Sequence, residues 1–432
     1  MPRRLSTSAA APISPLVDLS DHATVLAGIS TPQLATASLI FGVCQRQALM
    51  GPLLTVLRAA GSTALGAPLL AVVRRTAFRH FCAGETLQDC GRVARQMRSA
   101  AGVRLLVDHS VEERETAADW ALNLRNKRAL LGSCAETLGD GVAFVPVKVT
   151  ALASPALLEA MTRHIHAAGD GYLDAEVDPR TQLSAEEAEL LGSALENMGE
   201  LCAEAQRLRL PVLFDAEQSH RQPAIDFVCR RLQARFNRCE GGAPPVVYNT
   251  FQMYMVGAER RLARDLEHAR EGGFVLAAKV VRGAYLVSEA ERAAETGAAS
   301  PILKSKGATD VAYDRGISAL LRSIAKDQSA AVLIATHNQQ SVELAAREME
   351  RLGLPRNHPR VSMAQIMGMC DNLTLALGLA GYNSHKLVLY GDFGEVFPWL
   401  LRRLDENRDM LGAAQLELPL IRAELRRRLI GK

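Results

Sequence analysis

From about residue 100 onward, short apolar runs alternate with long stretches rich in Ala, Glu and Arg. The runs are rich in β-branched residues and almost continuously hydrophobic, which is typical of strands buried on both faces of a sheet. The stretches between them have helical spacing, and two clear examples are Ser184–Arg209, which opens on a capping-box pattern, and Ala308–Asp327. The eight predicted strands are Arg104–His109, Phe144–Thr150, Pro211–Glu217, Val246–Gln252, Val275–Arg282, Ala330–Asn338, Arg360–Ile366 and Lys386–Gly391.

Strands that alternate with helices form right-handed βαβ units around a parallel sheet. Eight such units predict a closed (β/α)8 barrel, as an α/β fold. An open, doubly wound parallel sheet would show the same alternation and is the rival fold. The long connection Ala151–Leu210 contains the stretch GDGYLDAEVDPRTQLS and is predicted to be a surface excursion.

Upstream of the barrel pattern, Pro32–Phe81 is rich in Leu and Ala at helical spacing. This segment predicts two or three amphipathic helices that either pack on the main domain or dock on a membrane surface. Its most apolar part, Pro52–Val73, contains Arg58 together with Gly and Pro, so no membrane-spanning helix is expected. The basic tail Ile421–Lys432 would suit an acidic surface, and a solvated helix face explains it equally simply.

The first residues, Met1–Pro15, contain two arginines, several hydroxyl side chains and no acid, the first acid of the chain being Asp18. That composition is typical of a mitochondrial transit peptide, and an unstructured terminus is the alternative. We therefore expect three regions: a transit peptide or unstructured terminus over 1–18, a helical region over 19–100 and the barrel over 101–432.

Composition narrows the class of protein. The chain has 432 residues, of which 48% are hydrophobic and 22% charged, so disordered, collagen-like and coiled-coil classes are excluded. A net charge of +3 argues against a general nucleic-acid binder, which would concentrate positive charge. The eight cysteines are scattered and form no CxxC pair, so we expect buried, reduced thiols rather than a disulfide scaffold.

Polar residues cluster at the carboxyl ends of the predicted strands, the edge at which barrel enzymes build their active sites. We therefore expect a functional site at this rim. No GxGxxG, GxxxxGK[ST], HExxH or GxSxG motif occurs, and no group of His, Cys and carboxylates has metal-ligand spacing, so no metal site is predicted. The rim residues are Lys148, Thr150, Asp215, Glu217, Gln252, Lys279, Arg282, Thr336, His337, Asn338 and Gln365.

The segment Gly391–Asn407, after the last predicted strand, carries the adjacent residues Arg402 and Arg403. Pro398 indicates a helix start nearby, and two guanidinium groups on a helix across the barrel mouth would clamp a carboxylate or a phosphate. Glu406 lies within helical reach of both arginines. A solvated amphipathic helix with ordinary ion pairs is the alternative interpretation.

Seven longer motifs follow one another along the chain: VKVTAL (Val147–Leu152), FDAE (Phe214–Glu217), VYNTFQMY (Val247–Tyr254), KVVRGAYLVSE (Lys279–Glu289), ATHN (Ala335–Asn338), QIMGMCD (Gln365–Asp371) and LLRRLDEN (Leu400–Asn407). Together they resemble the proline dehydrogenase family, in its eukaryotic mitochondrial form. The stretches Phe78–Glu85 and Leu19–Val43 are most similar to the plant-type enzymes. The resemblance covers almost the whole chain from about Leu19.

The resemblance implies a distorted (β/α)8 barrel with an N-terminal helical extension, a C-terminal helix across the barrel mouth and FAD as cofactor. It implies oxidation of L-proline to Δ1-pyrroline-5-carboxylate by hydride transfer from C5 to flavin N5, with electrons passed to a membrane quinone. It also implies a mitochondrial protein on the matrix side, in peripheral contact with the inner membrane. FAD, proline and quinone come from the resemblance alone.

The resemblance assigns substrate roles to single residues. Arg402 and Arg403 match the pair that grips the proline carboxylate, and Lys148 matches a strand-end lysine near substrate and flavin. Asp215 matches an aspartate of the substrate pocket, where we expect it to orient an arginine or Lys148. The remaining substrate-pocket positions are Tyr285, Ile366, Leu387 and Trp399.

It assigns cofactor roles in the same way. Gln252 matches the glutamine beside the isoalloxazine, and Lys279, an arginine in bacterial members, is expected near flavin N5. Lys306 matches a lysine near the phosphates, and Glu406 a glutamate on the adenosine or ribose side. The remaining cofactor positions, in the loop over the dinucleotide and the segment that cradles the pyrophosphate and ribitol, are Arg282, Gly283, Ala284, Thr336, His337 and Asn338.

Two positions depart from the family pattern. Leu387 stands where proline-type members have Tyr and hydroxyproline-type members tend to have a small polar residue, and Trp399 replaces a family Tyr. Both changes bear on substrate choice, so a dehydrogenase for hydroxyproline or another cyclic amino acid is the alternative. A barrel lyase that uses Lys148 as a Schiff-base amine and a non-catalytic binding module are further hypotheses from other classes.

Overall fold

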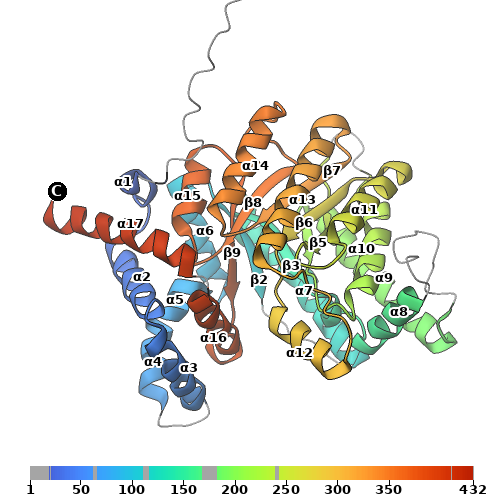
Figure 1. Ribbon diagram of the computed structural model, residues 1–432, viewed down its shortest axis with the longest axis horizontal. Helices are drawn as coiled ribbons and strands as arrows, with labels where there is room; N and C mark the ends of the chain where they lie inside the picture. The colour runs from blue at the N-terminus through green and yellow to red at the C-terminus, as the bar shows by residue number, and fades with distance from the viewer. Residues whose placement is uncertain are drawn as a thin grey trace, which may run out of the picture.

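The computed structural model describes residues 19, 21–61, 66–109, 116–167, 182–238, 243–409 and 411–431, with only the backbone at 47, 49, 50, 61, 402–409 and 411–416. The predicted transit segment 1–18 and most of the GDGYLDAEVDPRTQLS stretch lie outside these residues. Figure 1 shows a barrel flanked on one side by the N-terminal and C-terminal helices.

Nine parallel strands form one sheet in the part of the chain that the structure describes, in the order β1-β9-β2-β3-β4-β5-β6-β7-β8. Because β9 also pairs with β8, strands β2 to β9 close into an eight-stranded barrel. The closed barrel is therefore confirmed, and the open doubly wound sheet is wrong. The strands are β1 (Cys82–Gly84), β2 (Arg104–His109), β3 (Val142–Val147), β4 (Val212–Phe214), β5 (Val247–Gln252), β6 (Leu276–Val281), β7 (Ala330–Ala335), β8 (Val361–Ile366) and β9 (Ser384–Tyr390).

All eight predicted strands exist: Arg104–His109 has the predicted bounds, and the other seven differ at one or both ends. The predicted strand Pro211–Glu217 shortens to the three residues of β4, because its polar end leaves the sheet for the rim. Strand β1 was not predicted, since three residues carry no periodicity. It pairs with the last two residues of β9, where β8 has already ended.

The outer helices alternate with the strands, as the sequence pattern predicts. Ser184 opens α9 with the expected capping box to Glu187, and α13 begins two residues before the predicted start, capped by Ser305. The predicted surface excursion is partly wrong, because it contains an ordered helix, α8. These helices are α7 (Ala117–Leu138), α8 (Pro155–Ala167), α9 (Ala185–Leu208), α10 (Gln222–Phe236), α11 (Ala258–Gly272), α12 (Leu286–Thr296), α13 (Lys306–Asp327), α14 (Gln339–Arg351) and α15 (Asp371–Leu379).

One outer position is filled by a helix from before the barrel. Helix α6 (Leu87–Ala101) contacts both α7 and α15, the neighbours that a helix after β9 would have in a regular barrel. The helix that does follow β9, α16 (Phe393–Asp409), instead packs against the N-terminal helices. This exchange of α6 for α16 is the distortion of the barrel.

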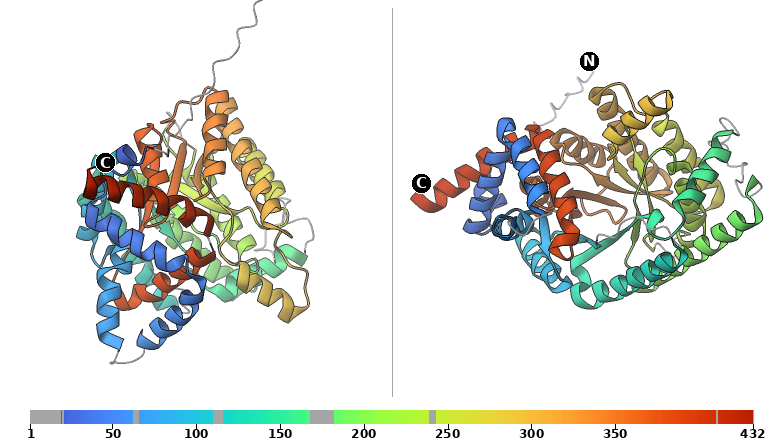
Figure 2. Two further views of the ribbon diagram at one scale, coloured as in Figure 1. Left: turned by 60° about the vertical axis from the view of Figure 1, so that its left-hand side comes forward. Right: turned by 90° about the horizontal axis from the view of Figure 1, so that it is seen from below.

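The described part of Pro32–Phe81, for which two or three helices were predicted, contains four, α2 to α5, and the short helix α1 precedes them. Helix α17 (Leu411–Ile430) lies along α2 and begins ten residues before the predicted tail helix (Figure 2). Across the described residues, no helix combines the length and apolarity that a membrane span needs. The helices are α1 (His22–Val25), α2 (Thr31–Cys44), α3 (Gln47–Gly61), α4 (Ala67–Arg75) and α5 (Ala77–Phe81).

Apolar side chains fill the barrel rather than leaving a pore. An interior cluster includes Leu106, Phe144, Leu213 and Tyr248, and Leu387 packs on it. At the bottom, His385 lies edge-on to Phe144 and bonds Ser362, and burial lowers its pKa to about 3. The seven cysteines in the described residues are all buried, as expected for thiols that act as small apolar side chains.

Candidate functional site

The barrel register decides which rim side chains face the mouth. Side chains alternate between the inside and outside of a strand, so residues two or four after an interior residue also point inward. Tyr248, Ala277 and Ala364 belong to the interior cluster. Gln252, Lys279 and Ile366 follow them at these spacings, and Leu387 packs on the cluster directly. The structure therefore brings these four predicted site residues together at the top of the barrel.

Asp215 and Lys279 form an ion pair across the mouth. The Lys279 Nζ donates to Asp215 Oδ1 over 2.6 Å, and the two side chains are 13% and 27% exposed. The expected partner of Asp215 was Lys148 or an arginine. The observed one is Lys279, because β6 carries its lysine inward at the height where β4 ends. Lys148 is half-buried at the end of β3.

Glu217, a predicted rim residue to which no role was assigned, is a buried carboxylate that organises the neighbouring loops. Glu217 accepts from both the backbone N–H and the hydroxyl of Thr150, at 3.2 and 3.0 Å. Its carbonyl accepts from Gln252 Nε2 (2.8 Å), and Gln252 Oε1 in turn accepts from the N–H of Ala284 (3.1 Å). Burial raises the pKa of Glu217, against the hydrogen bonds from Thr150 and the charge of Lys148. This series of hydrogen bonds fixes the Gln252 side chain and the Ala284 backbone.

The loop after β6 lies close against a buried ring. A Cβ on Gly283 would meet the ring of Tyr254 at 2.5 Å, so only glycine fits there without displacing the ring. Tyr254 Oη accepts from the N–H of Tyr285 at 3.2 Å, which holds the start of α12. Gly283 and Ala284 are exposed.

Arg282 is the hub of a polar cluster at the ends of β6 and β7. Its guanidinium donates to Asp310 (2.6 Å), Thr336 (2.8 Å) and Ser341 (3.0 Å), and it stacks over the Tyr313 ring at 4.3 Å. A guanidinium has five N–H donors, so two remain for a ligand.

The predicted phosphate lysine belongs to the same cluster. Lys306 pairs with Asp310 at 2.6 Å while 76% of its side chain is exposed. Burial alone would raise the pKa of Asp310, but the bonds from Lys306 and Arg282 hold it below its usual range. The cluster therefore stays charged and presents its cationic side to solvent.

The predicted segment Thr336–Asn338 leads into the N-terminus of α14. Asn338 caps that helix by accepting from the N–H of Ser341 (3.2 Å), and Thr336 Oγ1 accepts from the N–H of Asn338 (3.0 Å). His337 Nε2 accepts from the N–H of Ile366 (3.0 Å), so its proton lies on Nδ1. A helix N-terminus beside Arg282 is an environment that favours an anion such as a phosphate.

Helix α16 covers the upper ends of β8 and β9. Its residues Val396, Phe397 and Leu400 are buried in a cluster against which Ile366 and Trp399 pack. The helix begins at Phe393, so Pro398, which was expected near a helix start, lies inside the helix five residues after its first residue. The remaining predicted residues of this helix, Arg402, Arg403 and Glu406, lie on it beyond the described side chains.

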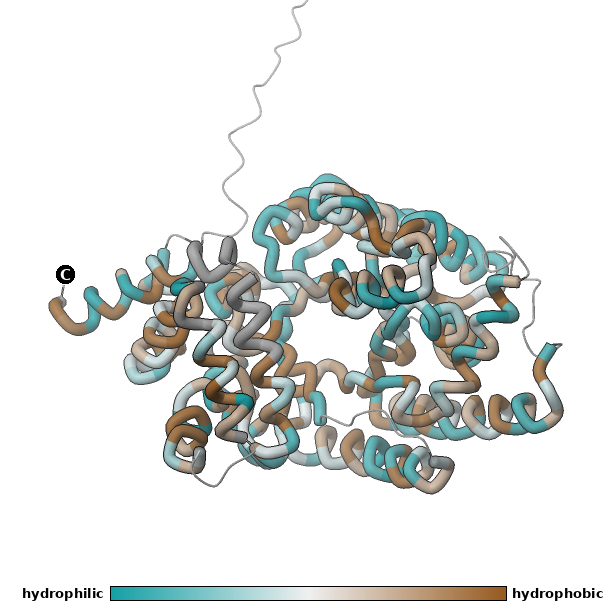
Figure 3. Tube along the Cα trace, turned by 60° about the horizontal axis from the view of Figure 1, so that its bottom comes forward, coloured by the Kyte–Doolittle hydropathy of each residue, from teal (hydrophilic) through white to brown (hydrophobic). Residues whose placement is uncertain are grey.

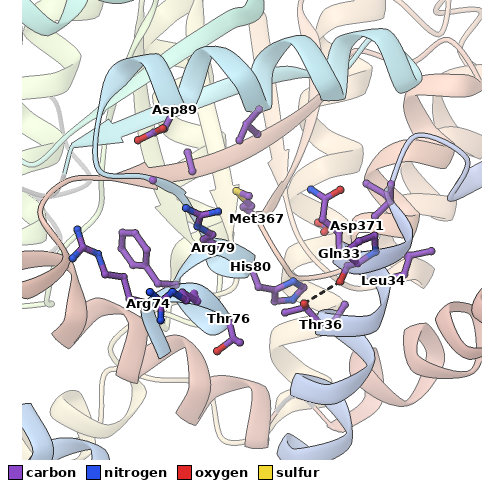
Figure 4. A pocket seen from close by; sticks show the side chains of 18 of the residues that line it. Gln33, Leu34, Thr36, Arg74, Thr76, Arg79, His80, Asp89, Met367 and Asp371 are labelled. Carbon is purple, nitrogen blue, oxygen red and sulfur yellow. Dashed lines mark hydrogen bonds between the residues drawn. The ribbon is translucent and has the colours of Figure 1, made fainter. Parts of the chain in front are cut away.

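A separate cavity of about 970 Å³ lies between α2, α4, α5 and α6 (Figure 4). His80, Met367, Asp371 and Glu417 are among the residues that line it. Among the described residues, no three His, Cys, Asp or Glu side chains come together as a metal site would require.

Fold and rim together define the class of protein. A closed parallel barrel whose carboxyl ends carry an ion pair, cationic side chains and a helix N-terminus is a (β/α)8 barrel of the enzyme type. The family model for "Proline dehydrogenase" matches residues 91–415. The chain is 32% identical to hydroxyproline dehydrogenase of Bos taurus, over 93% of this chain and 92% of that protein. The chain belongs to the proline dehydrogenase family of oxidoreductases.

Relatives named hydroxyproline dehydrogenase and relatives named proline dehydrogenase both match this chain. Proline dehydrogenase 1, mitochondrial, of Arabidopsis thaliana is 28% identical over 96% of this chain and 87% of its own length. Among solved structures, proline utilization A of Bdellovibrio bacteriovorus has a TM-score of 0.63 at 18% identity, and that of Bradyrhizobium japonicum 0.62 at 20%. The chain covers 32% and 48% of these two longer proteins, and the likeness concerns the fold.

Proposed function

We propose that this protein oxidises L-proline to Δ1-pyrroline-5-carboxylate, with FAD as cofactor and a membrane quinone as electron acceptor. The observation that carries the proposal is the rim, where Lys279–Asp215 and the Arg282 cluster flank a helix N-terminus in a chain of this family. A single site there could hold both an anionic dinucleotide and a small amino acid.

The residues present suit a bound dinucleotide. The N-terminus of α14, the two spare N–H donors of Arg282 and exposed Lys306 would hold the phosphates. Gly283 and Ala284 are exposed and carry no side chain or only a methyl group, so they would let the cofactor approach the backbone. Lys279 and Gln252 would flank the isoalloxazine, and Glu406, His337 and Asn338 the ribose and ribitol. FAD supplies the hydride acceptor when it is bound.

Substrate binding falls to the side chains on the other half of the mouth. Arg402 and Arg403 would grip the proline carboxylate, which fixes the ring with C5 toward the cofactor. Lys148 and Asp215 would line the polar side of the pocket. The apolar and aromatic walls would be Tyr285, Ile366, Leu387 and Trp399.

Little proton chemistry is required of the protein. If proline binds with a neutral amine, the nitrogen lone pair assists loss of hydride from C5, and no side chain has to act as a strong base. The Asp215 carboxylate holds the Lys279 ammonium in place over 2.6 Å. That fixed positive charge would stabilise negative charge that builds up on the cofactor.

We further propose that this protein is mitochondrial, as the names of its plant and human relatives state for those proteins. Its place on the matrix side of the inner membrane is our proposal from the family resemblance. Residues 1–18 would be a transit peptide, 19–100 a helical region and 101–432 the catalytic barrel.

A hydroxyproline dehydrogenase on the same barrel is the second candidate. It is favoured by the Bos taurus relative and by Leu387, which lacks the hydroxyl of the proline-type tyrosine. Leu387 cannot hydrogen-bond a 4-hydroxyl either, so the residue alone does not decide between the substrates.

Anaerobic reduction tests the proposal. The purified protein should be yellow, and L-proline should bleach its visible flavin absorbance faster than trans-4-hydroxyproline. Faster bleaching by hydroxyproline would establish the second candidate. A yellow protein bleached by neither would contradict both substrates, and a colourless protein that takes up no added FAD would contradict the cofactor as well.

A further inference from the structure

A fully buried lysine lies outside the barrel, directly before a predicted substrate residue. Lys386 points from β9 toward α15 with its side chain 0% exposed. Its Nζ pairs with Asp371 at 2.6 Å and also donates to Met369 O (3.0 Å) and Thr374 Oγ1 (2.9 Å). A buried ammonium is stable only when it is paired and hydrogen-bonded, so Asp371, Met369 and Thr374 together hold Lys386 in this position.

A second buried charge from far along the chain completes the cluster. Glu417, on α17 and 4% exposed, accepts from the backbone N–H groups of Cys370 and Asp371 at 2.9 Å and of Asn372 at 3.3 Å. These are first-turn N–H groups of α15, which have no partner within their own helix. The C-terminal helix therefore caps α15 through a carboxylate, and the two helices are tied at one point.

The surroundings of Glu417 raise the pKa of its carboxyl group, which favours the neutral form. Burial and the negative charge of Asp371 raise the pKa of Glu417 to about 7, while Lys386 and the N–H bonds oppose that shift. From α5, His80 shares the cavity wall with Asp371 and Glu417 and bonds the carbonyl of Gly368 at 3.0 Å (Figure 4). Burial lowers the pKa of His80, so it adds little positive charge at neutral pH.

The cluster continues to the barrel strands. Thr374 Oγ1 donates to Gln365 Oε1 (2.8 Å), and Gln365 Nε2 donates to the carbonyl of Thr336 (3.0 Å). Gln365 and Lys386 directly precede Ile366 and Leu387, which face the mouth. The anchor of α17 is thus joined by hydrogen bonds to the strand ends that carry the pocket wall.

We propose that Glu417 is a positioning residue: it docks α17 on α15 and thereby sets how α16 lies over the barrel mouth. Helix α16 ends at Asp409 and α17 begins at Leu411, so a fixed α17 leaves α16 little freedom at that end. The expected effect of Glu417 on substrate affinity rests on the proposed function, in which Arg402 and Arg403 of α16 bind the proline carboxylate. Its structural part stands independently of them.

The test compares three substitutions on α17. Glu417→Ala removes the cap, and Glu417→Gln keeps an oxygen that can accept the N–H bonds. Glu424→Ala is the matched control, because Glu424 is another buried glutamate of α17, paired at the far end with Arg427 and Arg428 of its own helix and bonded to His22 of α1, away from α15. Each is measured for flavin content, for KM and kcat with L-proline, and for Trp399 fluorescence in a Trp120→Phe background, where Trp399 is the remaining tryptophan.

Glu417→Ala should raise KM for L-proline about tenfold or more, with kcat within about threefold and flavin content unchanged. The Trp399 emission should shift, because Trp399 lies on α16. Glu417→Gln should restore both KM and the emission, and Glu424→Ala should alter neither. A normal KM and emission in Glu417→Ala, or the same rise in KM in Glu424→Ala, would overturn the proposal.

The fluorescence separates this inference from the proposed function. If the wild-type protein does not oxidise proline, the substrate assignment fails, but an emission shift in Glu417→Ala that Glu417→Gln reverses still supports the docking role. An unchanged emission overturns it whatever the substrate is. Should Glu417→Ala not fold, Glu417→Asp takes its place, and its shorter side chain should give an intermediate shift.

Discussion

Leu387 and Trp399 are the residues at which this chain differs most clearly from the family pattern. Leu387 packs on the interior cluster of the barrel, and Trp399 packs against the buried side chains of α16. Both are half-buried, so each has a face left for a ligand. In the proposed pocket they would make the wall more apolar than one built with two tyrosines. An apolar wall discriminates weakly against an added hydroxyl.

Among single residues of the proposed pocket, Arg403 provides the most direct test: Arg403→Met should weaken proline binding and leave FAD bound. A guanidinium–carboxylate contact in a closed site is worth several kcal/mol, so KM should rise on the order of 100-fold. Steady-state kinetics with flavin absorbance measure both quantities. Arg426→Met, an exposed arginine of α17, is the control and should behave as wild type. A near-normal KM in Arg403→Met would remove the clamp assignment.

Gly283→Ala should impair the cofactor site by a steric route. The added methyl group would press on the buried Tyr254 ring, and overpacking of this kind costs about 1–3 kcal/mol. We expect a lower Tm and a lower FAD content after purification. Gly192→Ala in α9 is the matched control, since nothing lies within 4 Å of its new methyl, and it should leave both unchanged or raise Tm slightly. Full FAD content in Gly283→Ala would contradict the assignment.

At the scale of elements, the decisive feature is the exchange of α6 for α16. Because α6 fills the outer position between α7 and α15, the helix after β9 is free to lie at the mouth, against α3 and α5. Its place there depends on apolar contacts of Phe397 and Leu400 and on the docking of α17 that follows it. Elements distant in sequence therefore build one wall of the site.

The cap of α15 predicts a pH dependence of stability. The pKa of Glu417 is raised from its ordinary value of 4.5 to about 7, so the folded state binds more protons than the unfolded state between those values. Stability contributed by this group is therefore present below pH 4.5 and is lost as pH rises to about 7. Relative to Glu417→Gln, which does not titrate, the wild-type protein should lose on the order of 3 kcal/mol across that window.

Calorimetric unfolding of both proteins from about pH 5 to about pH 8 measures this difference. Asp371, Lys386 and His80 surround the same carboxylate, and they are present in both proteins. A difference that stays flat, or that moves in favour of the wild-type protein as pH rises, would contradict the raised pKa.

At the scale of the whole molecule, the N-terminal helices differ from the barrel in charge. Residues 22–84 contain no Asp or Glu and five arginines, so α2 to α5 form a basic, apolar lobe beside a nearly neutral barrel. Figure 3 shows that apolar residues dominate the helices of this lobe. Val56 on α3 and Val72 on α4 are 52% and 56% exposed. Such a surface suits an anionic membrane better than an acidic protein, because it also offers apolar side chains.

Vesicle flotation tests this placement of the membrane contact. The protein should bind vesicles that contain anionic phospholipid, bind neutral phosphatidylcholine vesicles less, and dissociate as salt rises. Val56→Asp with Val72→Asp should reduce binding without changing dye-linked activity, since neither residue lies at the barrel rim. Arg426→Glu in the basic tail is the comparison. If only this tail variant loses binding, the contact lies on α17 instead.

Sequence determined much of this protein by itself. Buried parallel strands and amphipathic helices have periodicities of their own, so all eight barrel strands were predicted, and the two outer helices that were given bounds, Ser184–Arg209 and Ala308–Asp327, begin and end within two residues of α9 and α13. The rim was predictable for the same reason, because a polar residue directly after an apolar strand must lie at the carboxyl edge. Family motifs then supplied the proposed cofactor and substrate class, which no periodicity encodes.

Tertiary structure alone decided the rest. Asp215 pairs with Lys279 across 64 positions of the chain, and Glu417 caps α15 from 45 or more positions away. Helix α6, which takes the place of a helix after β9, likewise contacts the distant α15. Local sequence fixes a strand's register and a helix's apolar face, but contacts between distant segments depend on how the closed barrel places them. Those contacts set which charges meet at the mouth and how its covering helix is held.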